Sequence, residues 1–192
     1  AKSGARGPGR WRRVAPASIV ATLAELRTAD TDRTARLAHS RILGYAAVAA
    51  AVDAVPIAGV VAVPGVQAKL LHTLAEIHGV PWDRRTMTAF AGCLGASIIT
   101  RLLTSFGVRE AVKLVPVYGQ TVGAAVAAAA SFSTTYALGK AAGYFLARAR
   151  HGESDPAGVA AAYKRALEAA LGMAHERGLS SAGAKGGDYA QR

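Results

Sequence analysis

The residues best suited to chemistry lie in the stretch HTLAEIH, where His72 and Glu76 stand one helical turn apart and His78 follows. Histidine and glutamate are common zinc ligands, so this spacing would supply half of a metal site. A complete site needs three or four ligands, and the sequence places no second cluster of such residues near them. A solvated helix face is the simpler interpretation, and we expect no metal site.

Nucleophile and nucleotide chemistry leave equally little trace in the sequence. Cys93 is the only cysteine, and it stands in AGCLG between small apolar residues, which is typical of packing. The pair Gly139-Lys140 lacks the upstream glycine of a phosphate-binding loop, and GARGPG near the start follows no strand. No paired carboxylates and no Ser-His-Asp set stand out. The sequence therefore predicts a protein with no catalytic residues and no cofactor.

The elements that carry these residues are predicted to be helices. Of the 192 residues 52% are hydrophobic and 6% aromatic, which excludes disorder for the middle of the chain, and a single cysteine excludes a disulfide scaffold. Abundant Ala, Leu, Arg and Glu favour helix, while β-branched residues form no alternating runs. The predicted class is all-α: a membrane-associated helical bundle of two duplicated helix–Pro/Gly–helix units, followed by an amphipathic helix.

Capping residues and helix breakers set the expected boundaries. Helices are expected at about 18–29, from about 31 to a stop near Pro56, and at about 65–78, 84–106, 108–115, 118–150 and 157–177. Asp30 or Thr31 should cap the second helix, and Asp83 should cap the fourth. Pro64 suits the first turn of the third helix, because an N–H is not needed there. The last helix should be capped by Ser154 or Asp155.

Composition divides the chain into four expected segments. Residues 1–17 form a basic flexible arm, 18–150 a hydrophobic helical domain, 151–177 an amphipathic helix, and 178–192 a flexible tail. In the amphipathic helix the apolar positions keep to one face, namely Val159, Tyr163, Leu167, Ala170, Leu171 and Ala174.

The hydrophobic domain shows an internal repeat at a constant offset of 60 residues. Residues 40–59 read SRILGYAAVAAAVDAVPIAG and residues 100–119 read TRLLTSFGVREAVKLVPVYG, with eight identical positions. Two units, about 40–79 and 100–139, would cover each other's apolar helices around a pseudo-two-fold axis. The same alignment sets Asp53 opposite Lys113. An ion pair between them is one hypothesis, and exposure of each charge at a helix end is the other.

Two runs of this domain are almost free of charge. Between Arg41 and Lys69 lie 27 residues with Asp53 as the one charge, and between Lys113 and Lys140 lie 26 residues with none. Both runs reach the length of roughly 20 residues that a spanning helix needs. Flanking cations and aromatic residues would suit a membrane interface: Arg41, Lys69, Lys113, Lys140, Arg148, Arg150, Tyr118, Tyr136, Tyr144 and Phe145. We expect a membrane-associated domain, with the core of a soluble bundle as the alternative.

Small and hydroxylated residues in these runs bear on the same choice. Glycines four residues apart, such as Gly139 and Gly143, let helices approach closely in either environment. A polar cluster in the second run speaks against lipid unless its hydroxyl groups bond helix carbonyls or face other helices. The cluster consists of Ser131, Ser133, Thr134 and Thr135.

The N-terminal arm is strongly basic and contains no acidic residue. Its candidate contact residues are Lys2, Arg6, Arg10, Trp11, Arg12 and Arg13. Anionic lipid headgroups attract such an arm, and nucleic acid is the rival partner, although one tryptophan is the only interleaved aromatic residue. A solvated tail is the third interpretation. No short apolar run and cleavage site follow the basic start, so no secretory signal is predicted.

Two segments carry a family resemblance. VDAVPIAGVVAVPGVQAKLLHTLAEIHGV resembles the opening signature of the YcjF-like, GTPase-associated family of uncharacterised hydrophobic domains, and VKLVPVYGQTVGAAVAAAASFSTTYALGKAAGYFL resembles its second element. The resemblance covers about 45–148. It implies a membrane-associated domain that occurs alone or fused behind an Era-like small GTPase domain, with no assigned catalytic residue. AGVVAVPG departs from the family pattern, which usually has a polar or acidic residue between the two Pro elements.

These observations predict a non-catalytic membrane-associated anchor or scaffold that partners a small GTPase or a larger membrane complex. A soluble helical adaptor, which binds protein or nucleic acid through the basic arm, is the alternative. The expected location is a bacterial inner membrane or another intracellular membrane, with the arm on the cytoplasmic side, and a homo-oligomer is a candidate assembly. The expected structural residues are Asp53, Pro56, Gly59, Pro64, Lys113, Pro116 and Gly119.

Overall fold

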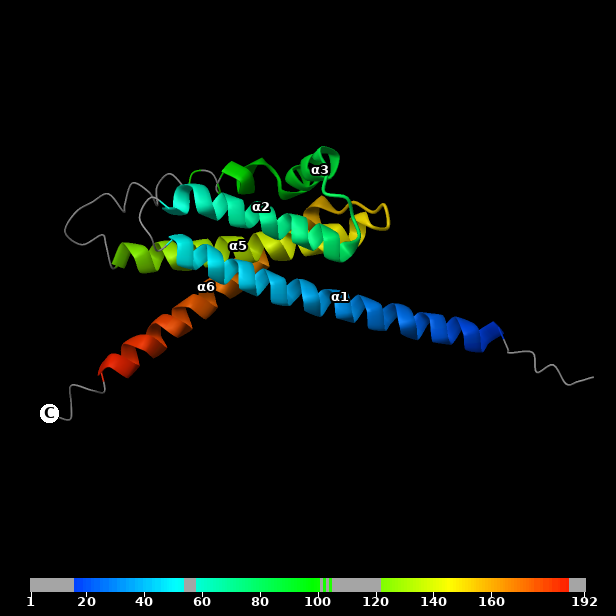
Figure 1. The fold of residues 1–192 in the computed structure, drawn as a ribbon, viewed down its shortest axis with the longest axis horizontal. Coiled ribbons are helices and arrows are strands. Elements are labelled where there is room, and N and C mark those ends of the chain that lie inside the picture. Colours follow the sequence, from blue (N-terminus) through cyan, green and yellow to red (C-terminus); the bar gives the residue numbers. More distant parts are fainter. Residues whose placement is uncertain (1–15, 54–57, 101, 103, 105–121, 187–192) are drawn as a thin grey trace, which may run out of the picture. The chain divides into compact units, whose positions relative to one another are not determined.

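The computed structural model describes residues 16–53, 58–100, 102, 104 and 122–186 (Figure 1). Regular structure in these ranges is helical throughout, which confirms the predicted all-α class. The chain divides into two units, Ala1–Thr34 and Ala35–Arg192. The expected basic arm lies outside the described residues except for its last two positions.

In the first unit, the structure describes the N-terminal portion of α1 (Pro16–Asp53). The side chains of residues 19–33 are all exposed, and four of them are large and apolar: Ile19, Val20, Leu23 and Leu26. The expected boundary between two helices at residues 30 and 31 is wrong, because α1 continues through both. The Thr31 hydroxyl donates to the Arg27 carbonyl at 2.8 Å, one turn back, and so caps no new helix.

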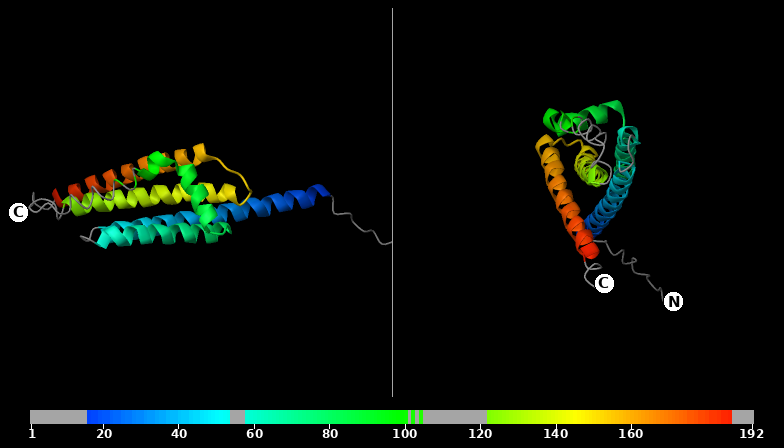
Figure 2. Two further views of the ribbon diagram at one scale, coloured as in Figure 1. Left: turned by 90° about the horizontal axis from the view of Figure 1, so that it is seen from above. Right: turned by 90° about the vertical axis from the view of Figure 1, so that its left-hand side faces the viewer.

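In the second unit, α5 (Val122–Ala149) lies between α2 (Ala58–His78) and α6 (Pro156–Gly186) and packs against both (Figure 2). A shorter helix, α3 (Arg84–Leu94), packs against α5 and α6. Residues 35–53 of α1 contact α2, where the hydroxyl oxygens of Tyr45 and Thr73 are 3.1 Å apart. Large side chains from these helices share one core, among them Ile42, Leu70, Leu74, Phe90, Phe145, Leu146 and Val159.

Pro64 lies inside α2 and not in its first turn as expected, because the helix begins at Ala58. A proline inside a helix leaves the carbonyl one turn earlier without its N–H partner. Burial along one face explains why the helix continues, because tertiary packing outweighs this local cost. The buried face consists of Val63, Gln67, Leu70 and Leu74. The helix ends as expected at Gly79, whose φ of 66° favours glycine.

The expected continuous helix over about 84–106 is interrupted. Asp83 caps α3 as predicted, with its carboxylate accepting a hydrogen bond from the Thr86 N–H at 2.8 Å. The helix ends at Leu94 because Gly95 has a φ of 80°, a left-handed conformation that a helix cannot contain. Residues 96–100 are helical again. The helix expected at about 108–115 lies outside the described residues.

The last helix, α6, is longer than expected. It begins at Pro156 behind the predicted cap Asp155 and continues to Gly186, so residues 178–186 are helical and do not belong to a loose tail. Its buried positions, Val159, Tyr163, Ala166 and Ala170, recur every three or four residues and confirm one apolar face. Leu171, which was placed on that face, is exposed.

The duplication stays a prediction, because residues 101, 103 and 105–121 of its second unit, including Lys113, Pro116 and Gly119, lie outside the described residues. Pro56 lies outside them as well. Both helices over the aligned ranges 62–79 and 122–139 are described, and they differ where the units end: Gly79 ends α2 with a positive φ, whereas Gly139 lies within α5.

Candidate functional site

A buried carboxylate stands at the C-terminal end of α1. Asp53 is 3% exposed and accepts a hydrogen bond from the Ser131 hydroxyl of α5. The hypothesis that Asp53 points into water is therefore wrong, while Lys113, its expected ion-pair partner, lies outside the described residues. A Cβ added to Gly59 would meet the Asp53 carboxylate, with Cγ at 3.1 Å. Gly59, one of the expected structural residues, therefore lies in close contact with Asp53, where a larger side chain would not fit.

A second polar pair follows in the same interior. The amide Nε2 of Gln67, on α2, donates to Oγ1 of Thr135, on α5, at 3.1 Å. The hydroxyl groups of Ser133 and Thr134 donate to the carbonyls of Ala129 and Ala130, each at 2.8 Å. The predicted condition for this cluster, bonding to helix carbonyls or to other helices, is confirmed.

Three helices approach one another closely at Gly139. A Cβ on Gly139 would lie 2.8 Å from Cγ1 of Ile42, on α1, and 3.2 Å from Cδ2 of Leu70, on α2. The residues adjacent in sequence to these three, Arg41, Lys69 and Lys140, are all exposed. Because their neighbours touch, the three cations lie at one level of the bundle, each on a different helix. We call them the basic ring.

On one side of the basic ring the described surface of α1, α2 and α5 carries no exposed charge. This apolar end consists of residues 42–53 of α1, 58–68 of α2 and 126–139 of α5, and its one charged side chain is the buried Asp53. Its exposed residues are Leu43, Gly44, Ala47, Val48, Ala51, Val61, Pro64, Gly65, Ala68 and Val126. The exposed face of α6, which packs on α5, does carry charge, at Lys164, Arg165 and Glu168. The uncharged surface therefore belongs to α1, α2 and the adjoining part of α5.

Three of the four expected interface aromatics are described, and they serve other purposes. Tyr136 and Phe145 are buried in the core, and Phe145 packs on Phe90 with ring centroids 5.4 Å apart. Tyr144 is bonded to a carboxylate within the bundle, while Tyr118 lies outside the described residues. Their expected role as membrane anchors is therefore not supported by their orientation. None of the described helices combines the length and the apolar composition that crossing a bilayer requires.

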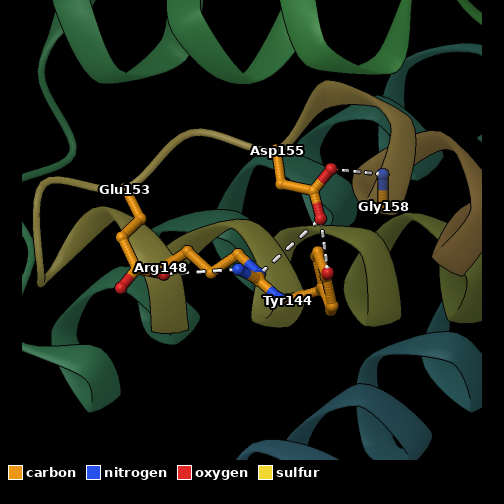
Figure 3. A network of polar contacts seen from close by, with 5 residues as sticks. All are labelled: Tyr144, Arg148, Glu153, Asp155 and Gly158. Carbon is orange, nitrogen blue, oxygen red and sulfur yellow. Dashed lines mark hydrogen bonds and ion pairs between the residues drawn. The ribbon is translucent and has the colours of Figure 1, made fainter.

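A polar network joins α5 to the start of α6 at the far end of the bundle (Figure 3). The Tyr144 hydroxyl donates to Oδ2 of Asp155 at 2.7 Å, and the Gly158 N–H donates to Oδ1 at 2.9 Å. Arg148 stacks on the Tyr144 ring at 4.8 Å and lies 3.3 Å from a Glu153 oxygen. The hydrogen bonds from Tyr144 and Gly158 lower the pKa of Asp155. This network fixes the turn between the two helices.

The candidate metal ligands do not converge. His72 and Glu76 pair with each other at 3.3 Å on an exposed face of α2. Both ring nitrogens of His78 are buried without a hydrogen-bond partner in the described part of the chain, and burial, followed by the charge of Arg150, lowers its pKa. Within the described residues no three histidine, cysteine, aspartate or glutamate side chains could hold one metal ion. Cys93 is buried in the core, as a packing residue should be.

The basic ring is the feature that sequence reasoning missed. Arg41, Lys69 and Lys140 were noted separately as residues that flank apolar runs. Their common level depends on the contact of Gly139 with Ile42 and Leu70, which no local pattern specifies. The signal available in the sequence was the absence of charge on one side of each cation.

The arm residues expected to contact lipid or nucleic acid, Lys2 to Arg13, lie outside the described residues. The site that the structure offers is therefore the basic ring with the apolar end. Comparison of the chain with models of protein families, with curated proteins and with solved structures gives no match.

Proposed function

We propose that this protein is a non-catalytic helical scaffold that works at an anionic membrane surface, where it holds a protein partner such as a small GTPase or a larger membrane complex. One observation carries the proposal. Charge is segregated along α1, α2 and α5, so that their surface without exposed charge adjoins three exposed cations. Anionic headgroups attract such cations, and the interface beneath the headgroups accepts apolar surface.

The proposal that the protein is non-catalytic is supported by the hydrogen bonds of its buried polar side chains. The buried Asp53 and Ser131 bond each other, and so do Gln67 and Thr135. Their hydrogen bonds join helices. Together with a sequence that has no phosphate-binding loop, this pattern favours a structural role.

Vesicle binding tests the proposal. The full chain should float with vesicles of phosphatidylcholine and phosphatidylglycerol, and float much less with phosphatidylcholine alone, because the attraction is to negative charge. Binding should weaken as salt is raised, since mobile ions screen exposed charges. A chain that stays unbound with both kinds of vesicle at low salt would contradict a membrane function.

A helical adaptor remains the second candidate, and the first unit favours it. Four large apolar side chains on α1, namely Ile19, Val20, Leu23 and Leu26, are 50–65% exposed. An exposed amphipathic helix next to a basic arm suits a protein groove or, through the arm, nucleic acid. Fluorescence anisotropy with labelled duplex DNA and single-stranded RNA separates the nucleic-acid version: saturable binding there, without vesicle binding, would favour the adaptor.

A further inference from the structure

We infer that the helical bundle itself docks on the membrane: the basic ring binds lipid phosphates, and the apolar end lies among the acyl chains of one leaflet. This inference rests on the proposed function and names the part of the protein that carries it. The protein could also work at a membrane through its N-terminal arm alone. Experiments can therefore separate binding through the bundle from binding through the arm.

The first argument is the level of the three cations. Gly139, Ile42 and Leu70 meet in the interior, and Lys140, Arg41 and Lys69 are their neighbours in sequence on three different helices. Each of the three cations is exposed. Long basic side chains on neighbouring helices can reach separate phosphate groups in one plane while their aliphatic stems stay on the apolar side.

The second argument is the depth of the apolar end. Residues 42–53 of α1 lie beyond the ring and rise roughly 18 Å at 1.5 Å per residue, and residues 58–68 of α2 rise roughly 16 Å. One leaflet contributes about half of the roughly 30 Å hydrocarbon core. Residues 126–139 of α5 rise roughly 21 Å by the same measure, so the depth of the uncharged portion is closer to one leaflet than to the whole hydrocarbon core.

The third argument is that the interior polar groups need no water. Helical backbone groups bond each other, which is the condition for helices in lipid, except at the helix ends and at the carbonyl one turn before Pro64. The Asp53 carboxylate accepts from Ser131 inside the bundle, and the hydroxyl groups of Ser133 and Thr134 bond helix carbonyls.

Charge also favours lipid over a second copy of the chain as the occupant of this surface. A parallel pair of copies would set two rings of three cations side by side. An antiparallel pair would set each ring beyond the other copy's apolar end, without an acidic group there among the described exposed residues. An anionic headgroup layer above an acyl layer offers both complements at the right relative height.

A depth measurement tests the inference directly. In a Cys93→Ala background, the variants Val61→Cys and His72→Cys place one environment-sensitive fluorophore on each side of Lys69 along α2. Both native side chains are exposed, so both sites accept a label. With phosphatidylcholine–phosphatidylglycerol vesicles, the label at 61 should shift to the blue and be quenched by nitroxides on the acyl chains. The label at 72 should stay in a polar environment. Equal behaviour of the two labels overturns the inference.

A charge comparison supplies the second arm. The variant Arg41→Gln, Lys69→Gln, Lys140→Gln removes the ring, and the matched variant Arg84→Gln, Arg85→Gln, Arg150→Gln removes three exposed cations elsewhere. The ring variant should bind anionic vesicles roughly a hundredfold more weakly, because each basic residue near the surface contributes severalfold. The matched variant should change binding less than tenfold. Equal losses contradict a specific ring.

Variants of the arm and a test for dimers complete the experiment, and two of their outcomes would overturn the inference. If the bundle docks, neutralising the arm cations Lys2, Arg6, Arg10, Arg12 and Arg13 should leave the depth signal at position 61 in place. If the ring variant binds normally and the arm variant does not bind, the arm alone is the membrane contact, and the proposed function survives without this inference. If the label at 61 is already buried without vesicles, and light scattering shows a dimer that Val61→Glu dissociates, a second copy occupies the surface.

Discussion

Gly139 offers the sharpest test of the packing, because α5 approaches two helices at this residue. Replacement by alanine adds one methyl group. The new Cβ would lie 2.8 Å from Cγ1 of Ile42, 3.0 Å from its Cγ2 and 3.2 Å from Cδ2 of Leu70. Real Cβ contacts are longer, so the helices must separate or the two side chains must leave their rotamers. Gly143, one turn further on α5, has no atom within 4 Å of its added Cβ and serves as the control.

The two variants share their helix-propensity gain and differ in the steric cost. Alanine is favoured over glycine within a helix by about 1 kcal/mol, so Gly143→Ala should stabilise the protein by that amount. Overpacking costs about 1–3 kcal/mol, which leaves Gly139→Ala about 0–2 kcal/mol less stable than the wild type. The free energies of unfolding of the two variants should therefore differ by about 1–3 kcal/mol.

Urea unfolding followed by far-UV circular dichroism measures this difference. With a urea dependence of about 2 kcal/mol/M, the midpoint of Gly139→Ala should lie about 0.5–1.5 M below that of Gly143→Ala. Equal midpoints would refute the close approach of the three helices. They would also remove the basis for placing the three ring cations at one level.

Three further predictions concern the polar contacts. Thr135→Val should lower the free energy of unfolding by about 1–3 kcal/mol, because the buried Gln67 amide loses its acceptor, and adding Gln67→Leu should recover part of the loss in the same urea assay. Burial lowers the pKa of His78, so stability should fall as the pH drops below the ordinary value of 6.5, and thermal melts of His78→Phe should show a flatter pH dependence there. The hydrogen bonds from Tyr144 and Gly158 lower the pKa of Asp155 below its ordinary value of 3.8. The contribution of Asp155 to stability is therefore complete above pH 3.8 and is lost as the pH falls through the lower pKa of the folded state. The variant Asp155→Asn should remove this acid dependence from the thermal midpoint.

Local signals in the sequence predict the helical class and several boundaries. Asp83 and Asp155 cap their helices because a carboxylate can accept from the free N–H groups of a first turn. Gly79 ends α2 because glycine adopts a positive φ without strain. Each of these features depends on a few adjacent residues, which is why the sequence is sufficient.

Other boundaries depend on tertiary packing and were predicted wrongly. Pro64 resembles a helix start, but the buried face of α2 holds the helix together around it. Thr31 resembles a cap, but its hydroxyl can equally bond the Arg27 carbonyl within a continuous helix. The basic ring of Arg41, Lys69 and Lys140 depends on how three helices are aligned, which the repeat and the charge pattern leave open.

The buried Asp53–Ser131 pair has a consequence for how the helices find their alignment. Residues 127–130 of α5 are four alanines, and small identical side chains let one helix slide along another at little cost. A slide of one turn in one direction would set the Asp53 carboxylate against Ala127, where it would lose the hydrogen bond that Ser131 gives it; a slide in the other direction would set it against Thr135, which already bonds Gln67. The pair therefore fixes the alignment of α1 against α5. The double variant Asp53→Asn, Ser131→Ala should keep its helix content, but its methyl NMR signals should broaden because several alignments of the two helices become populated. In a bundle made largely of alanine, valine and glycine, shape alone says little about which alignment is native, and a few interior polar atoms supply that information.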